Sequence, residues 1–90
     1  MALERKVPLL HKTGLHLRAA GCLAEAAGKF SSDVRLTVGG RTVNAKSVLE
    51  ILTLGAGPGV ELHLQAEGED AEPALCALET LIRENFNENA

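Results

Sequence analysis

Residues 14–20 read Gly-Leu-His-Leu-Arg-Ala-Ala and hold the side chains with the clearest chemical potential. They lie between an alternating, strand-like stretch and an alanine-rich stretch of helical period, so His16 falls at the start of a predicted helix. A helix N-terminus offers unpaired N–H groups and the positive end of the helix dipole. Arg18 offers a planar fork of donors that matches phosphate oxygens, and imidazole is a nucleophile near neutral pH. The spacing predicts a phosphoryl site on His16 and Arg18.

The composition narrows the class of protein. We expect 90 residues to form a single domain, 1–90, with one modest core. The net charge of −3, two phenylalanines and the lack of tryptophan and tyrosine argue against nucleic-acid binding. Cys22 and Cys76 are too few for a disulfide framework and read as buried or half-buried helix residues in a reducing cytosol. No signal core or membrane-length apolar run is present, so we expect a cytoplasmic protein without membrane insertion.

Hydrophobic periodicity and turn residues predict the order β-α-β-β-α-β-α, an α+β fold. Each strand has one apolar and one polar face, which is typical of an antiparallel sheet covered by helices on one side. The expected elements are a strand near 4–10, a helix over 17–29, a strand over 34–38, a Gly39-Gly40 hairpin, a strand over 42–45, a short helix from Ser47, a loop over 55–59, a strand over 60–66 and a final helix after Asp70.

Single residues refine these elements. Pro8 lacks an N–H, so the first strand should lie at a sheet edge. Ser47 and Glu50 have the spacing of a capping box. Asp70 is expected to cap the last helix, with Pro73 in its first turn.

Three blocks of sequence resemble the phosphocarrier protein HPr family of the bacterial phosphoenolpyruvate-dependent sugar phosphotransferase system. Residues 14–20 match the family pattern Gly-Leu-His-x-Arg-Pro-Ala except at Ala19, where the family usually has proline. Lys46-Ser47 followed by Leu54-Gly55 matches a second block, and residues 68–71 match a third. The resemblance spans residues 4–86 and implies an open-faced β-sandwich, a four-stranded sheet in the order first, fourth, second, third with three helices on one face.

The resemblance also implies a reaction. Enzyme I would pass a phosphoryl group to Nδ1 of His16, and His16 would pass it to an enzyme IIA for sugar transport. Arg18 would contact the phosphate, no cofactor would be needed, and the chain would be a carrier with a phosphohistidine intermediate rather than a stand-alone enzyme. Ala19 adds an orphan N–H near the phosphate and loosens the first helical turn, which affects phosphohistidine lifetime or marks a specialised paralogue.

Further positions follow from the same resemblance. Ser47 matches a site that a serine kinase phosphorylates in Gram-positive members, although its simpler role is the helix cap. An apolar partner-binding surface would include Leu17, Gly21, Val48, Leu49 and Leu52. Lys12, Lys29 and Lys46 could ring that surface and steer acidic partners. His11 and His63 have no metal-ligand spacing and read as plain strand residues, so we expect no metal site.

Two other functions stay open on the sequence alone. An HPr paralogue could serve a nitrogen-related or dihydroxyacetone-kinase phosphorelay, which Ala19 leaves possible. A non-catalytic regulatory binding module could use the same surface, but it would not require the pair His16 and Arg18. In each case we expect a monomer with protein partners.

Overall fold

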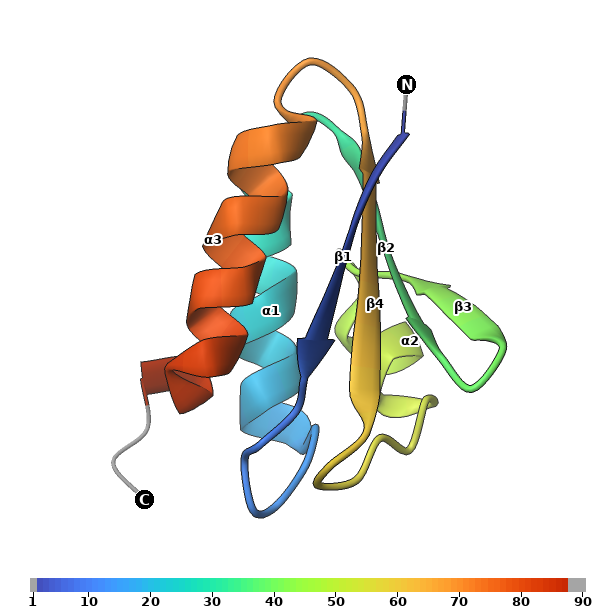
Figure 1. The fold of residues 1–90 in the computed structure, drawn as a ribbon, viewed down its shortest axis with the longest axis vertical. Helices are drawn as coiled ribbons and strands as arrows, with labels where there is room; N and C mark the ends of the chain where they lie inside the picture. Colours follow the sequence, from blue (N-terminus) through green and yellow to red (C-terminus); the bar gives the residue numbers. More distant parts are fainter. Residues whose placement is uncertain (1, 88–90) are drawn as a thin grey trace.

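The computed structural model describes residues 2–87, in which strands and helices alternate in the expected order (Figure 1). A short 3-10 turn, η1, ends this part of the chain at Asn85–Asn87 and was not predicted from the sequence. The elements are β1 Ala2–Pro8, α1 Leu17–Gly28, β2 Asp33–Val38, β3 Arg41–Asn44, α2 Val48–Leu52, β4 Glu61–Glu67 and α3 Ala71–Arg83.

The strands form one antiparallel sheet in the order β1-β4-β2-β3, which confirms the expected topology. β1 lies at an edge of the sheet, as expected from Pro8. Among residues 2–87, no strand pairs with its outer side, so the missing N–H of Pro8 breaks no hydrogen bond there. Gly39 and Gly40 join β2 to β3 with φ of 56° and 85°, a conformation that glycine adopts without strain.

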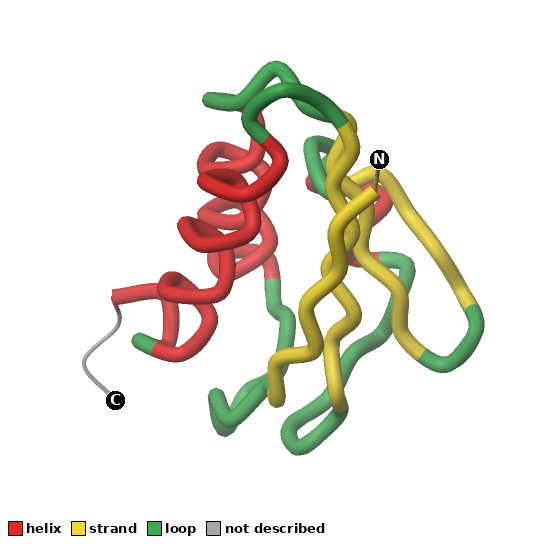
Figure 2. The backbone as a smooth tube through the Cα atoms, turned by 45° about the horizontal axis from the view of Figure 1, so that its top comes forward, coloured by secondary structure: helices red, strands yellow, loops and turns green. Residues whose placement is uncertain are grey.

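The helices cover one face of the sheet and leave the other open (Figures 1 and 2). Alternate strand residues point toward the helices, α3 packs against β1 and β4, and α1 packs with its buried alanines between α2 and α3. On the open face the strands present polar side chains such as Glu4, Arg35 and Gln65. The fully buried large side chains include Val7, Leu9, Leu23, Val34, Leu36, Ile51, Leu62, Leu64, Leu75, Leu78 and Ile82.

Several expected bounds need correction. The first strand runs over residues 2–8 rather than 4–10, and the third begins one residue earlier than expected. The pairing of β1 with β4 nevertheless continues past Pro8, because the Leu9 N–H donates to the Val60 carbonyl at 2.8 Å and the Leu9 carbonyl accepts from Gly59 at 2.7 Å. Cys22 is half-buried in α1 as expected, whereas Cys76 is exposed on α3.

Asp70 stands at the start of α3 as expected, but its side chain does not cap that helix. Instead, one carboxylate oxygen accepts from the Ser32 N–H at 2.8 Å and from the Ser32 hydroxyl, and the other accepts from the Ser31 N–H at 2.8 Å. The Ser32 hydroxyl first, then the Ser31 and Ser32 amides, lower the pKa of Asp70 from 3.8 to about 2. The carboxylate therefore fastens the α1–β2 connection to the start of α3.

The Asp70 contacts predict a specific acid sensitivity. Because the folded pKa lies below the ordinary value, ionised Asp70 stabilises the fold fully above about pH 4, and that contribution is lost as the pH falls from about 4 toward 2. We expect Asp70→Asn to lower stability at pH 7 and to flatten the decline between pH 4 and 2, measured by urea unfolding at each pH. Glu69→Gln, at an exposed neighbour, is the matched control. Parallel pH profiles for wild type and Asp70→Asn would contradict the assignment.

Candidate functional site

The loop between β1 and α1 is fixed by backbone hydrogen bonds to the loop before β4. The Leu15 N–H donates to the Ala56 carbonyl at 2.9 Å, and the Gly14 N–H closes a turn onto the His11 carbonyl at 3.0 Å. Gly14 has φ of 70°, and a Cβ there would lie 2.5 Å from the Ala56 oxygen. Only glycine fits this backbone, so the loop presents the next residues to α1 in one fixed arrangement.

His16 is the N-cap of α1. Its backbone is extended, with φ of −87° and ψ of −179°, and its carbonyl accepts from the Ala20 N–H at 2.9 Å. Its Nδ1 atom accepts from the Arg18 N–H at 3.2 Å, as a carboxylate or hydroxyl oxygen would in an ordinary cap. An N–H can only donate, so Nδ1 carries a lone pair and neutral His16 has its proton on Nε2. The imidazole nitrogen that faces the helix end is thus the nucleophilic one.

The first turn of α1 is prepared for an added anion. It contains Arg18 and no acidic residue, whereas α2 and α3 have Glu50 and Glu72 in their first turns. Among residues 2–87, the N–H groups of Leu17 and Ala19 have no acceptor. Two unused amides and an uncompensated positive helix end therefore lie beside Nδ1 of His16.

Arg18 is exposed, and within residues 2–87 its guanidinium forms no hydrogen bond or ion pair. The side chain is therefore unconstrained and can turn toward a group bound at the helix end. Ala19, where the family pattern has proline, is fully buried and supplies one of the two unused amides. The substitution thus leaves the nucleophile in place and adds a donor beside it.

His11 was wrongly expected to be a plain strand residue. It lies beyond the end of β1 and is 5% exposed, and its ring centroid lies 5.2 Å from that of His16. The signal for its burial was present in the sequence, because Val7, Leu9 and His11 alternate and the first two are fully buried. His63 does lie in β4, as expected.

The expected apolar surface is divided between exposed and half-buried residues. Leu17 is 67% exposed on α1 and Leu49 is 77% exposed on α2, and these two helices pack against each other. Gly21, Val48 and Leu52 are half-buried beside them. Leu10, in the loop before His16, is also 70% exposed, although it is not among the residues expected to form this surface. Exposed leucines around a nucleophile suit contact with a protein.

Lys46, one of the lysines expected to steer acidic partners, makes a contact within the chain. Its ammonium donates to the Phe30 carbonyl at 2.8 Å, and so joins the segment before α2 to the end of α1. Lys12 is exposed in the loop before His16 and remains a candidate for that role, whereas Lys29 is exposed at the end of α1 opposite to His16.

Ser47 caps α2, but the capping box is incomplete. The Ser47 hydroxyl accepts from the Glu50 N–H at 3.2 Å, as expected. The Glu50 carboxylate, however, accepts from the Asn44 N–H at 3.0 Å instead of reaching back to Ser47. Glu50 therefore ties α2 to the end of β3.

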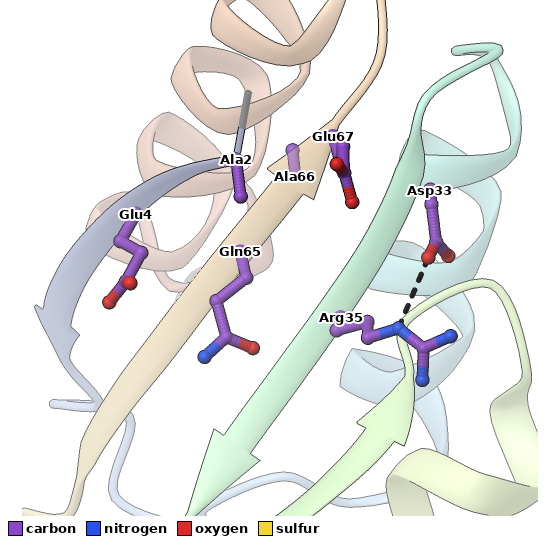
Figure 3. Close-up of a pocket in the computed structure, with 7 residues that line it drawn as sticks. All are labelled: Ala2, Glu4, Asp33, Arg35, Gln65, Ala66 and Glu67. Atoms are coloured by element: carbon purple, nitrogen blue, oxygen red, sulfur yellow. Dashed lines mark hydrogen bonds and ion pairs between the residues drawn. The ribbon is translucent and has the colours of Figure 1, made fainter.

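The hollow on the open face of the sheet is separate from this chemistry. Residues at the start of β1 and β2 and the end of β4 line it, and Arg35 donates to Asp33 across 3.1 Å within it (Figure 3). It lies at the opposite end of the strands from the β1–α1 loop (Figure 1). Among residues 2–87, no three His, Cys, Asp or Glu side chains gather as a metal site, and no helix is long and apolar enough to cross a membrane.

The family model described as the PTS HPr component phosphorylation site matches residues 3–84. The chain belongs to the HPr family. This is the family of phosphocarriers of the phosphotransferase system, whose members work with the enzymes of that system.

Similar proteins cover nearly the whole chain. The phosphocarrier protein HPr of Cupriavidus necator is 40% identical over 86 residues, which are 96% of this chain and 97% of that protein. The crystal structure of HPr-C-His from Thermoanaerobacter tengcongensis superposes with a TM-score of 0.93 at 40% identity, covering 98% of this chain and 99% of that one. An HPr from Bacillus anthracis gives a TM-score of 0.86 at 36% identity, over 90% and 96% of the two chains.

Gly14 offers a direct test of how the HPr fold holds this loop. We expect Gly14→Ala to destabilise the protein by about 3 kcal/mol or more, because it combines a left-handed backbone with a clash against the Ala56 carbonyl. Gly55→Ala is the matched control, since Gly55 has φ of 59° but no atom near an added Cβ, and should cost about 1 kcal/mol. Chemical unfolding measures both, and equal losses would show that the contact with Ala56 does not constrain the loop.

Proposed function

We propose that this HPr-family chain accepts a phosphoryl group from enzyme I on Nδ1 of His16 and relays it to an enzyme IIA of the sugar phosphotransferase system. The observation that carries the proposal is the Arg18 N–H bond to Nδ1, which directs the imidazole lone pair at the positive end of α1. No cofactor is required, because the donor protein supplies the phosphoryl group and the nitrogen supplies the electron pair.

In the transfer step, the Nδ1 lone pair forms a bond to phosphorus while the bond between phosphorus and the donor breaks, and its electron pair returns to the donor. The proton on Nε2 of His16 stays in place, so the ring needs no general base. Nδ1 must release the Arg18 N–H to attack, and that N–H is then free to donate to a phosphoryl oxygen. The unused amide of Leu17, an exposed residue, is a further donor for the same group.

We assign Arg18 the role of stabilising negative charge on the phosphoryl group during transfer, and not the role of docking the partner protein. Its guanidinium is exposed and close in sequence to the nucleophile, which suits transient contact with phosphoryl oxygens during transfer. The partner surface is proposed to consist of Leu17, Gly21, Val48, Leu49 and Leu52, and the carrier to act as a cytoplasmic monomer.

We assign Ser47 first to capping α2, because its hydroxyl already accepts from the Glu50 N–H. A kinase that phosphorylated Ser47 would place a dianion at the helix amides but close to the Glu50 carboxylate. Regulatory phosphorylation is therefore the secondary proposal for this residue.

His16 substitutions separate the phosphocarrier from a binding module. We expect His16→Ala and His16→Asn to take up no acid-labile phosphate from enzyme I and phosphoenolpyruvate, with the fold retained. The asparagine oxygen can still accept from the Arg18 N–H, so His16→Asn should unfold no more easily than His16→Ala, which loses a cap worth about 1 kcal/mol. Radiolabelled phosphoenolpyruvate and intact-mass measurement give the uptake. Phosphate found on either variant would show that another residue is the phosphoacceptor. A wild type that binds enzyme I without taking up phosphate would favour the regulatory binding module.

Arg18 substitutions separate transfer from docking. Arg18→Ala should slow single-turnover transfer by about 100-fold and change the dissociation constant for enzyme I little, because the guanidinium acts mainly on charge in the transition state. Arg18→Lys should recover part of the rate, since it keeps the charge but loses the fork of donors. Rapid-quench kinetics and calorimetry provide the two quantities. A weakened complex with an unchanged transfer rate would make Arg18 a docking residue.

A further inference from the structure

His11 is a buried imidazole between the phosphoacceptor and the C-terminal turn. Its ring centroid lies 5.2 Å from that of His16 and 6.0 Å from that of Phe86, with an interplanar angle of 57° in both pairs. Both separations lie within the range of favourable aromatic contacts. The side chain of His16 therefore meets the ring of His11, which is itself backed by Phe86.

His11 is held in place by the same local device that holds His16. Its Nδ1 accepts from the N–H of Thr13, two residues on, at 3.2 Å, just as Nδ1 of His16 accepts from Arg18. The Thr13 hydroxyl lies 2.7 Å from the same nitrogen. With 5% of its surface exposed, His11 is inaccessible to a phosphoryl donor, so its ring can act on the reaction only through His16.

The turn that places Phe86 behind His11 contains strained backbone. Phe86 has φ of 58°, a region that costs residues other than glycine and asparagine about 1–2 kcal/mol, and Asn85 before it has φ of 52°. Phe86 is nevertheless buried, and η1 contacts both α3 and α1. Packing thus keeps a strained aromatic residue where it backs His11, as expected when a turn serves a neighbouring site.

We infer that His11 is a positioning residue for phosphoryl transfer at His16, an inference that rests on the proposed function. The Arg18 N–H bond orients the His16 ring before the reaction, but Nδ1 gives up that bond when it attacks phosphorus. The ring contact with His11 does not depend on the Arg18 N–H bond, so loss of that bond leaves His11 beside the His16 ring. His11 therefore limits rotation of the His16 imidazole once Nδ1 no longer accepts from the Arg18 N–H, and keeps Nδ1 directed at the helix end.

Two substitutions separate the ring of His11 from its hydrogen bond. His11→Phe keeps a ring against His16 but loses the acceptor for Thr13, whereas His11→Asn keeps an acceptor for the Thr13 N–H and loses the ring. We expect His11→Asn to lower kcat for phosphorylation by enzyme I about 10-fold with KM unchanged, and His11→Phe to restore most of the rate. Val34→Ala, in the core of β2, controls for general destabilisation and should keep the wild-type rate while folded.

Two further readouts make the result independent of enzyme I. With phosphoramidate as a small-molecule donor, His11→Asn should again slow modification of His16, and the ring ¹⁵N signals of unphosphorylated His16 should shift in His11→Asn but not in Val34→Ala. Unchanged kcat, or a raised KM at constant kcat, would overturn the inference, as would unchanged His16 ring signals. If the wild type takes no phosphoryl group from either donor, the proposed function fails, and the ring signals alone decide whether His11 positions His16.

Discussion

The proposed phosphoryl site depends on one hydrogen bond, from the Arg18 N–H to Nδ1 of His16. It makes an imidazole the cap of a helix, a position usually held by a hydroxyl, amide or carboxylate oxygen. The same geometry selects the tautomer, directs the lone pair and places the nucleophile where a dianion is stabilised. Because this hydrogen bond is long and exposed, breaking it so that Nδ1 can bond to phosphorus would cost little free energy. A shorter cap, buried in the core, would hold the ring equally well but would resist transfer.

The rest of the fold keeps that cap in place. The loop that carries His16 is bonded to the loop before β4 through Leu9 and Leu15, and Gly14 lets the two backbones approach closely. At the other end of α1, Lys46 binds the Phe30 carbonyl, and Asp70 holds Ser31 and Ser32. Both ends of the helix are thus tied to other elements, so its first turn is presented as a rigid part of the molecule. A carrier without an enclosing pocket needs such a preformed site, because its partners supply the remaining surface.

The sequence predicted the fold well because its local signals agree with one another. The alternation in β4, the glycine pair of the hairpin, the Ser47 cap and the position of Asp70 before α3 all specify elements that the structure contains. What it could not predict were choices among long-range partners. The Asp70 carboxylate is suited to capping α3, but it accepts three hydrogen bonds from Ser31 and Ser32, which lie 39 and 38 residues earlier in the chain. The Glu50 carboxylate accepts from the Asn44 N–H and not from the Ser47 N–H. His11 was predicted to be a strand residue because the alternation of Val7 and Leu9 continues to it. The structure places it beyond β1, in a ring contact with His16 that no spacing rule predicts. Such choices depend on packing in three dimensions rather than on local propensity.

The central claim, that Nδ1 of His16 accepts the phosphoryl group at the end of α1, is tested most directly by locating the phosphorus atom. The ¹⁵N-labelled chain would be phosphorylated with enzyme I and phosphoenolpyruvate and observed by ³¹P–¹⁵N correlation NMR. We predict coupling of phosphorus to Nδ1 of His16 and displacement of the Arg18 amide proton signal, because that N–H exchanges a nitrogen acceptor for a phosphoryl oxygen. Coupling to Nε2 of His16, or to another histidine, would contradict it.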